Sequence, residues 1–125
     1  MGLDMYAFRS SKLGLMNEEV DFPALKDAEE IAYWRKFNHL HGWMEKLYRS
    51  KGGQEESFNC VGVRLDADDL DQLEKDLKVG LPHTPGFFFG GPEVWPDHME
   101  MTKEFISKAR DALEHEYGVY YYSWW

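Results

Sequence analysis

Polar side chains that can do chemistry are mixed with aromatic ones between Glu30 and Tyr48, a stretch whose spacing predicts a helix. Four side chains in this stretch recur at i, i+4, i+7 and i+11, which places them in one stripe along a helix. They are Trp34, Asn38, His41 and Glu45. The amide and the imidazole lie where apolar burial begins, and an unpaired buried polar group costs about 1–3 kcal/mol. Either the protein or a ligand must pair them, so the stripe predicts a pocket wall.

Three further residues complete this predicted ligand-binding pocket. Arg35 lies near the stripe on the same predicted helix, and Asp4 and Tyr122 close the cleft if the first and last strands cover this helix. A buried histidine held by a core hydrogen bond is the more common arrangement. The sequence therefore leaves two alternatives open for His41, a structural partner or a small-molecule ligand.

Other residues with chemical capability lack the spacing that known sites need. His39 and His41 are two apart, so on a helix they point about 200° from each other and cannot chelate one metal. The acidic run from Asp66 lacks the glycine and the glutamate of a calcium loop. The glycines around residues 87–89 match neither a Walker loop nor a dinucleotide fingerprint. We therefore expect no metal, no cofactor and no phosphate-binding loop.

Cys60 is the only cysteine, which leaves no disulfide within the chain and favours a reducing compartment. It lies in a predicted core strand without a local catalytic signature, so we interpret it as a small buried hydrophobe. No nucleophile and base are paired anywhere in the sequence. We predict no catalytic residues, and an enzyme is the least favoured of the function classes.

The charge of the chain excludes several kinds of partner. The net charge is −9 and the isoelectric point is about 4.9, whereas binding to nucleic-acid phosphates or anionic lipid needs clustered lysine and arginine. The N-terminus has no secretory signal pattern, and no run of 18 apolar residues occurs. We expect a cytoplasmic protein with no direct nucleic-acid contact and no membrane contact.

The sequence predicts one α+β domain spanning 1–125, in which three helices pack on a small, mainly antiparallel sheet and hold these residues in place. Alternation and β-prone runs predict four short strands, at 3–9, 58–65, 86–90 and 119–124. Helical spacing predicts three helices, at about 30–48, after Asp66 up to Gly80, and at about 97–117. Between the first strand and the first helix, residues 10–25 predict a long loop.

Local signals place the ends and the faces of these helices. Asp27 with Glu30, and Asp66 with Asp69, have the spacing of capping boxes. Gly42 inside the first helix costs about 1 kcal/mol relative to alanine, so we expect a close packing partner or a bend there. The first helix should point Arg35, His39 and Lys46 outward and bury four apolar side chains. The four are Trp34, Phe37, Leu40 and Met44.

The opening MGLDMY, the segment EIAYWRKFNHLHGW, the LP-x-x-x-GFFFG run and the ending YYYSWW together resemble a family of small uncharacterised proteins encoded by bacteriophages and prophages. No activity is established for that family as a whole, so the resemblance carries over no catalytic residue. Small phage accessory proteins are usually binders of host components. The resemblance therefore implies an accessory protein of the bacterial cytoplasm.

Two functions follow as expectations. The first is a non-catalytic binding or inhibitory module that acts on a host protein, which a patch of exposed tryptophans such as Trp95, Trp124 or Trp125 would favour. The alternative is a protein that binds a small, nucleotide-like molecule in a pocket on the first helix, which a concave surface over the stripe would favour.

Overall fold

The computed structural model describes residues 2–10, 20, 28–86 and 89–125. Its four strands form one antiparallel sheet in the order β2-β1-β4-β3. The strands are β1 (Asp4–Ser10), β2 (Glu29–Arg35), β3 (Gly62–Leu65) and β4 (Gly118–Trp124). Three helices pack on the sheet, α1 (Asn38–Ser50), α2 (Ala67–Val79) and α3 (Pro96–Glu114). The predicted α+β class, with four strands and three helices, is confirmed.

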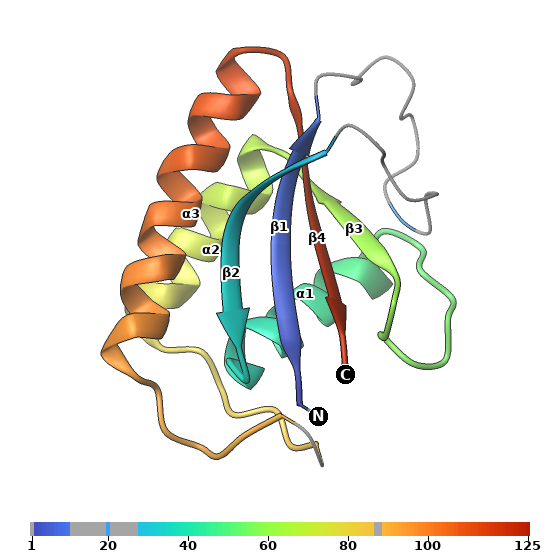
Figure 1. The fold of residues 1–125 in the computed structure, drawn as a ribbon, viewed down its shortest axis with the longest axis vertical. Helices are drawn as coiled ribbons and strands as arrows, with labels where there is room; N and C mark the ends of the chain where they lie inside the picture. The colour runs from blue at the N-terminus through green and yellow to red at the C-terminus, as the bar shows by residue number, and fades with distance from the viewer. Residues whose placement is uncertain (1, 11–19, 21–27, 87–88) are drawn as a thin grey trace.

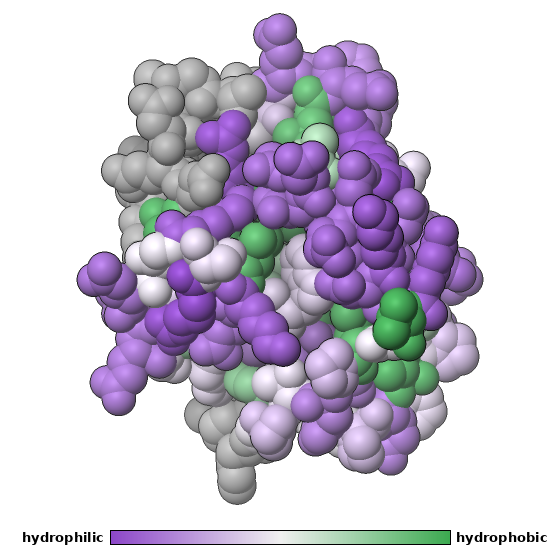
Figure 2. Space-filling model, turned by 180° about the vertical axis from the view of Figure 1, so that it is seen from behind, coloured by the Kyte–Doolittle hydropathy of each residue, from purple (hydrophilic) through white to green (hydrophobic). Residues whose placement is uncertain are grey.

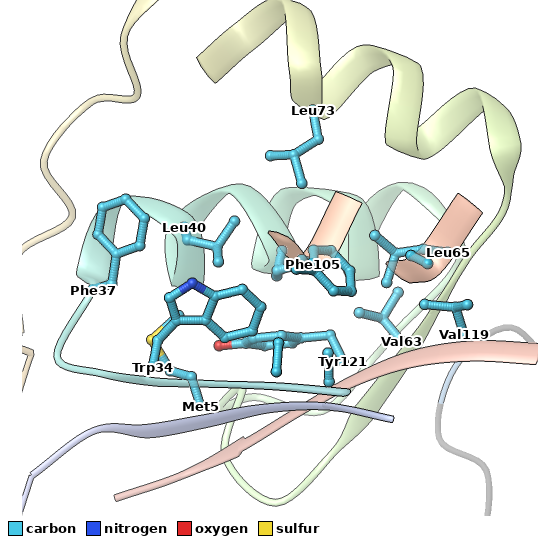
Figure 3. Close-up of a cluster of buried hydrophobic side chains, with 14 of the residues drawn as sticks. Met5, Trp34, Phe37, Leu40, Val63, Leu65, Leu73, Phe105, Val119 and Tyr121 are labelled. Carbon is cyan, nitrogen blue, oxygen red and sulfur yellow. The ribbon is translucent and has the colours of Figure 1, made fainter. Parts of the chain in front are cut away.

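The helices gather on one side of the sheet. Figure 1 shows α1 and α2 behind the strands, with α3 running beside β2. Because successive strand residues point to opposite faces, every second side chain reaches the helices. Trp34 and Tyr121 rise from β2 and β4 toward Leu40, Leu73 and Phe105 (Figure 3). The four apolar side chains predicted to be buried are all buried in this core.

The predicted helix over 30–48 is wrong in its first part. Residues 29–35 form β2, whose buried Ala32 and Trp34 alternate with the exposed Tyr33 and Arg35, a two-residue period. The chain then reverses through Lys36, which has a left-handed φ of 56°, and α1 begins at Asn38. Pairing with β1 selects the strand over the helical alternative. Glu30 is therefore not a capping residue, and Asp27 lies outside the described residues.

The predicted strand over 86–90 is also wrong. Gly86, Phe89 and Gly90 belong to no strand, and the Phe89 N–H donates to Gly86 O at 3.2 Å. Residues 87 and 88 lie outside the described residues. Phe89 is nevertheless buried, because an apolar run between turns can fill a core without joining a sheet. The fourth strand of the sheet is β2 instead.

Several local predictions hold. Asp66 and Asp69 form a capping box, with both backbone-to-carboxylate distances at 2.9 Å, and Gly80 ends α2 with a φ of 109°. A Cβ on Gly42 would lie 1.9 Å from Thr84 Oγ1, so a neighbour does pack closely there. Most of the predicted loop over 10–25 lies outside the described residues, and Ser10 itself ends β1. None of the described helices has the length and apolarity needed to cross a membrane.

Candidate functional site

The structure does not bring the seven predicted ligand-binding residues together. Trp34 lies on β2 rather than on the helix, and its Nε1 donates to Thr102 Oγ1 at 3.0 Å. Its ring meets Phe105 edge to face, with 5.4 Å between the ring centroids. Trp34 is therefore a core residue between β2 and α3, and only Asn38, His41 and Glu45 of the stripe lie on α1.

Asn38, the first residue of α1, is held by the chain between α2 and α3, which we call the 80–95 connection. Its amide nitrogen donates to Gly91 O at 2.8 Å and to Phe89 O at 3.3 Å. Its Oδ1 accepts from Thr84 N at 2.9 Å and lies 2.9 Å from His83 Nδ1. The protein itself therefore supplies the partners of this buried amide.

His41 is fully buried one turn along α1. Its Nδ1 lies 2.7 Å from Tyr121 Oη and 3.4 Å from Ser123 Oγ, and its Nε2 makes no hydrogen bond with a described residue. Aromatic rings surround the imidazole, with centroids 4.9 Å away for Phe89 and 5.3 Å away for Trp125. Burial lowers the pKa of His41 to about 4, so the ring is neutral at pH 7.

The strand residues expected to close the cleft point the other way. Tyr121 and Ser123 of β4 face His41, so Tyr122 faces the opposite side of the sheet, and Asp4 shares that side with it. Asp4 Oδ1 accepts from the Tyr33 hydroxyl at 2.6 Å, and this bond raises the pKa of Tyr33 to about 12. Asp4 and Tyr122 therefore do not meet the polar residues of α1.

The two charged members of the predicted pocket are exposed or partly exposed. Arg35 ends β2 as an exposed residue, and Glu45 is half-buried on α1 within 3.3 Å of Arg49. Glu45, Lys46 and Arg49 border a shallow hollow of about 410 Å³. Of the stripe, Glu45 lines a hollow on the surface.

His39, which was expected to point outward, is buried under the 80–95 connection. Its Nε2 lies 3.1 Å from Pro92 O, and His98 Nε2 lies 3.0 Å from Arg35 O. Phe37 stacks on His98 with 4.6 Å between the ring centroids. Burial lowers the pKa values of His39 and His98, which keeps both rings neutral at pH 7. Local periodicity could not reveal this, because the covering chain is distant in sequence.

Cys60 also differs from its prediction. It is exposed, it precedes β3, and it has a left-handed φ of 60°. Its Sγ lies 3.6 Å from Asn59 Oδ1. Within the described part of the chain, no three histidine, cysteine or acidic side chains gather in a way that could hold a metal ion.

Three further hollows lie around the C-terminal end of α2. A hollow of about 430 Å³ between α1 and α2 shares Gly80 and Leu81 with one of about 260 Å³. The smaller hollow shares Leu77 and Met99 with a third, of about 560 Å³, between α2 and α3. We call these three connected hollows the helix groove. The groove was not predicted from the sequence. The one available signal was a pair of apolar residues, Val79 and Leu81, that flank the predicted helix end at Gly80 and do not belong to the apolar face of α2.

The helix groove combines an apolar floor with a charged rim. Trp43, Leu47, Leu81 and Ile106 line it together with the exposed Val79 and Val94. Seen from the helix side in Figure 2, hydrophobic side chains gather at the lower right of a mostly hydrophilic surface. Four cationic side chains and two carboxylates also line the groove. They are Lys46, Lys78, Lys103 and Arg110, with Glu74 and Asp76.

No protein-family model, no curated protein and no solved structure matches this chain. The resemblance to small phage proteins therefore stays a prediction, and the geometry of the described residues has to carry any inference about function.

Proposed function

We propose that this protein is a non-catalytic module that binds another protein through the helix groove. The observation that carries the proposal is the exposure of apolar side chains around the end of α2, where Val79 is 87% and Val94 is 44% exposed. Soluble proteins rarely leave a contiguous apolar patch beside a groove unless something docks there. Trp95, which is 59% exposed, follows Val94 directly and is of the residue type most enriched at binding hot spots.

The buried polar groups of α1 support the same proposal, because they already bond to other residues of the protein rather than pointing into an open pocket. Asn38 and His41 were the residues expected to hold a nucleotide-like ligand, but they bond to the 80–95 connection and to β4. The His41 and Tyr121 pair is fully buried and enclosed by rings, so a substrate has no access to it in this conformation. A small-molecule pocket on α1 therefore has less support than a protein-binding groove.

The resemblance to phage proteins gives this proposal its biological setting. If it holds, the partner is a protein of the bacterial host, and binding inhibits or redirects that protein. Trp124 on β4 is a second exposed tryptophan, 47% exposed, and it lies outside the residues that line the groove. It therefore offers a control position on a different surface.

Native mass spectrometry of the protein purified from bacterial cells tests the proposal. We expect a second protein in a fixed ratio, lost in Val79→Asp and retained in Trp124→Ser. A retained small molecule without any protein would favour the ligand-binding alternative. Loss of the partner in Trp124→Ser but not in Val79→Asp would move the docking surface from the groove to the sheet.

A further inference from the structure

We infer that the helix groove receives an acidic amphipathic segment of the partner, a stretch with apolar anchors flanked by aspartate and glutamate. This inference rests on the proposed function and adds the chemistry of the occupant. It comes from one juxtaposition, an apolar floor bordered by lysines that form no ion pair with another described residue.

The lysines at the rim are unpaired while the carboxylates are engaged. Lys46, Lys78 and Lys103 are exposed and form no ion pair with a described residue. By contrast, Glu74 lies 3.0 Å from the Arg110 guanidinium, and this contact lowers the pKa of Glu74. Asp76 accepts from Trp43 Nε1 and from Gln72 Nε2, both at 2.9 Å. The charged groups of the groove that have neither an ion-pair nor a hydrogen-bond partner among the described residues are therefore the positive ones.

This positive rim opposes the charge of the chain as a whole. Four cations against two carboxylates line the groove, whereas the protein carries a net charge of −9. At physiological ionic strength the Debye length is about 8 Å, so an occupant of the groove responds to the nearby lysines more than to the distant acidic surface. Complementary charge at the rim then favours an acidic segment and disfavours a basic one.

The floor suits side-chain anchors in series. The three connected hollows measure about 430, 260 and 560 Å³ and are lined by Trp43, Leu47, Leu77, Met99 and Ile106. Peptides that bind such grooves present apolar residues at i, i+3 or i+4, and i+7, with polar residues between them. Because Lys46 lies at one end and Lys78 and Lys103 at the other, carboxylates on both flanks of the anchors find partners.

Two other occupants fit less well. Nucleic acid would place phosphates on the lysines, but it would leave the apolar floor without contacts. An anionic membrane would cover both the lysines and the apolar residues, yet a bilayer is flat and would not fill hollows on either side of α2. A protein segment matches the charge, the apolarity and the concavity together.

A peptide array provides the probe. Two sets of helical peptides carry the same series of leucine, phenylalanine and tryptophan anchors. The positions that flank the anchors are glutamate in one set and lysine in the other. We expect the strongest binders to come from the glutamate set. The best of them, measured by fluorescence anisotropy, should bind about threefold or more weakly when salt is raised from about 0.05 to 0.5 M.

Paired charge reversals locate the contact. Lys78→Glu with Lys103→Glu should weaken binding of the best glutamate peptide about tenfold, because attraction at two positions becomes repulsion. The matched control is Lys75→Glu with Lys108→Glu, which changes the net charge equally on the same two helices but at exposed residues outside the groove. We expect the control to weaken binding by no more than about twofold. Far-ultraviolet circular dichroism confirms that both variants are folded.

Several results would overturn the inference. They are stronger binding by the lysine set, equal losses in the two double variants, and no peptide binding while vesicles of phosphatidylserine and phosphatidylcholine bind the protein. If any of these occurs while Val79→Asp still releases a copurified protein, the proposed function stands and only the acidic occupant is wrong. If no protein copurifies and neither peptide set binds, both are wrong.

Discussion

The 80–95 connection contributes to two contrasting regions. One is the start of α1, where polar side chains are buried, and the other is the helix groove, where apolar side chains are exposed. The middle part of the connection covers the start of α1, where Thr84, Phe89 and Gly91 satisfy the buried Asn38. Its two ends place Leu81 and Val94 in the helix groove, where apolar side chains stay on the surface. Polar residues with chemical capability therefore do not by themselves mark a binding site. Exposed apolar side chains beside a hollow are the better indication of a docking surface, and here they lie in the groove.

The two regions should also differ in how they respond to substitution. Removing one member of a buried polar network leaves its partners unpaired in a medium of low dielectric constant, which is costly. Exposed apolar side chains contribute little to the free energy of unfolding, because folding removes little of their surface from water. Substitutions at the start of α1 should therefore act on stability, and substitutions at the groove should act on binding.

Within the buried polar residues of α1, the largest effect is expected for Asn38→Ala. This change removes both donors to the connection and leaves Thr84 N without its acceptor, so we expect it to lower the free energy of unfolding by about 2–4 kcal/mol. Urea denaturation measures the loss. Glu45→Gln on the same helix is the control, since its partly exposed ion pair with Arg49 contributes less than about 1 kcal/mol. Equal stability of Asn38→Ala and the wild type would mean that the connection is not anchored at α1.

Acidification should weaken the same region. The pKa of His41 is about 4 in the folded protein against about 6.5 for an unperturbed histidine, so the unfolded chain binds more protons, and stability falls as pH drops below about 6.5. Between pH 8 and pH 5 this group alone should remove about 2 kcal/mol. The lowered pKa values of His39 and His98 act in the same direction. His41→Leu should therefore lose less stability than the wild type between these two pH values, and an identical loss would contradict the assignment.

A smaller effect is expected for Tyr121→Phe, which removes the hydroxyl 2.7 Å from His41 Nδ1 and keeps the ring. We expect a loss of about 1–2 kcal/mol, because Ser123 Oγ at 3.4 Å is a poor replacement. Tyr6→Phe on the opposite face of the sheet serves as the control and should stay within about 0.5 kcal/mol of the wild type. If the two variants behave alike, the bond between His41 and Tyr121 contributes nothing measurable.

The sequence allowed the fold class and the caps of α2 to be predicted, the caps because they depend on local signals such as Asp66 and Gly80. The predicted number of strands agrees with the structure because β2 stands in place of the strand expected over 86–90. The sequence did not separate β2 from α1, since Ile31, Tyr33 and Trp34 fit either period and the choice depends on pairing with β1. Asn38 and His41 were identified as buried polar residues and His39 was not, and the partners of the first two lie 53 residues away on the 80–95 connection and 80 residues away on β4. Such distant contacts leave no trace in local spacing.

The smallest effect on the free energy of unfolding is expected for Val79→Ser. This variant is also the most direct test of the difference between the buried start of α1 and the exposed groove. Val79 is the last residue of α2 and is 87% exposed, so the free energy of unfolding should change by less than about 0.5 kcal/mol. Leu77→Ala, two residues earlier at a position only 8% exposed, should cost about 2–5 kcal/mol. Urea denaturation of both variants makes the comparison. A loss above about 1 kcal/mol for Val79→Ser would show that this side chain packs against the protein itself. The groove would then be closed in solution, and the apolar surface around α2 would belong to the core rather than to a partner.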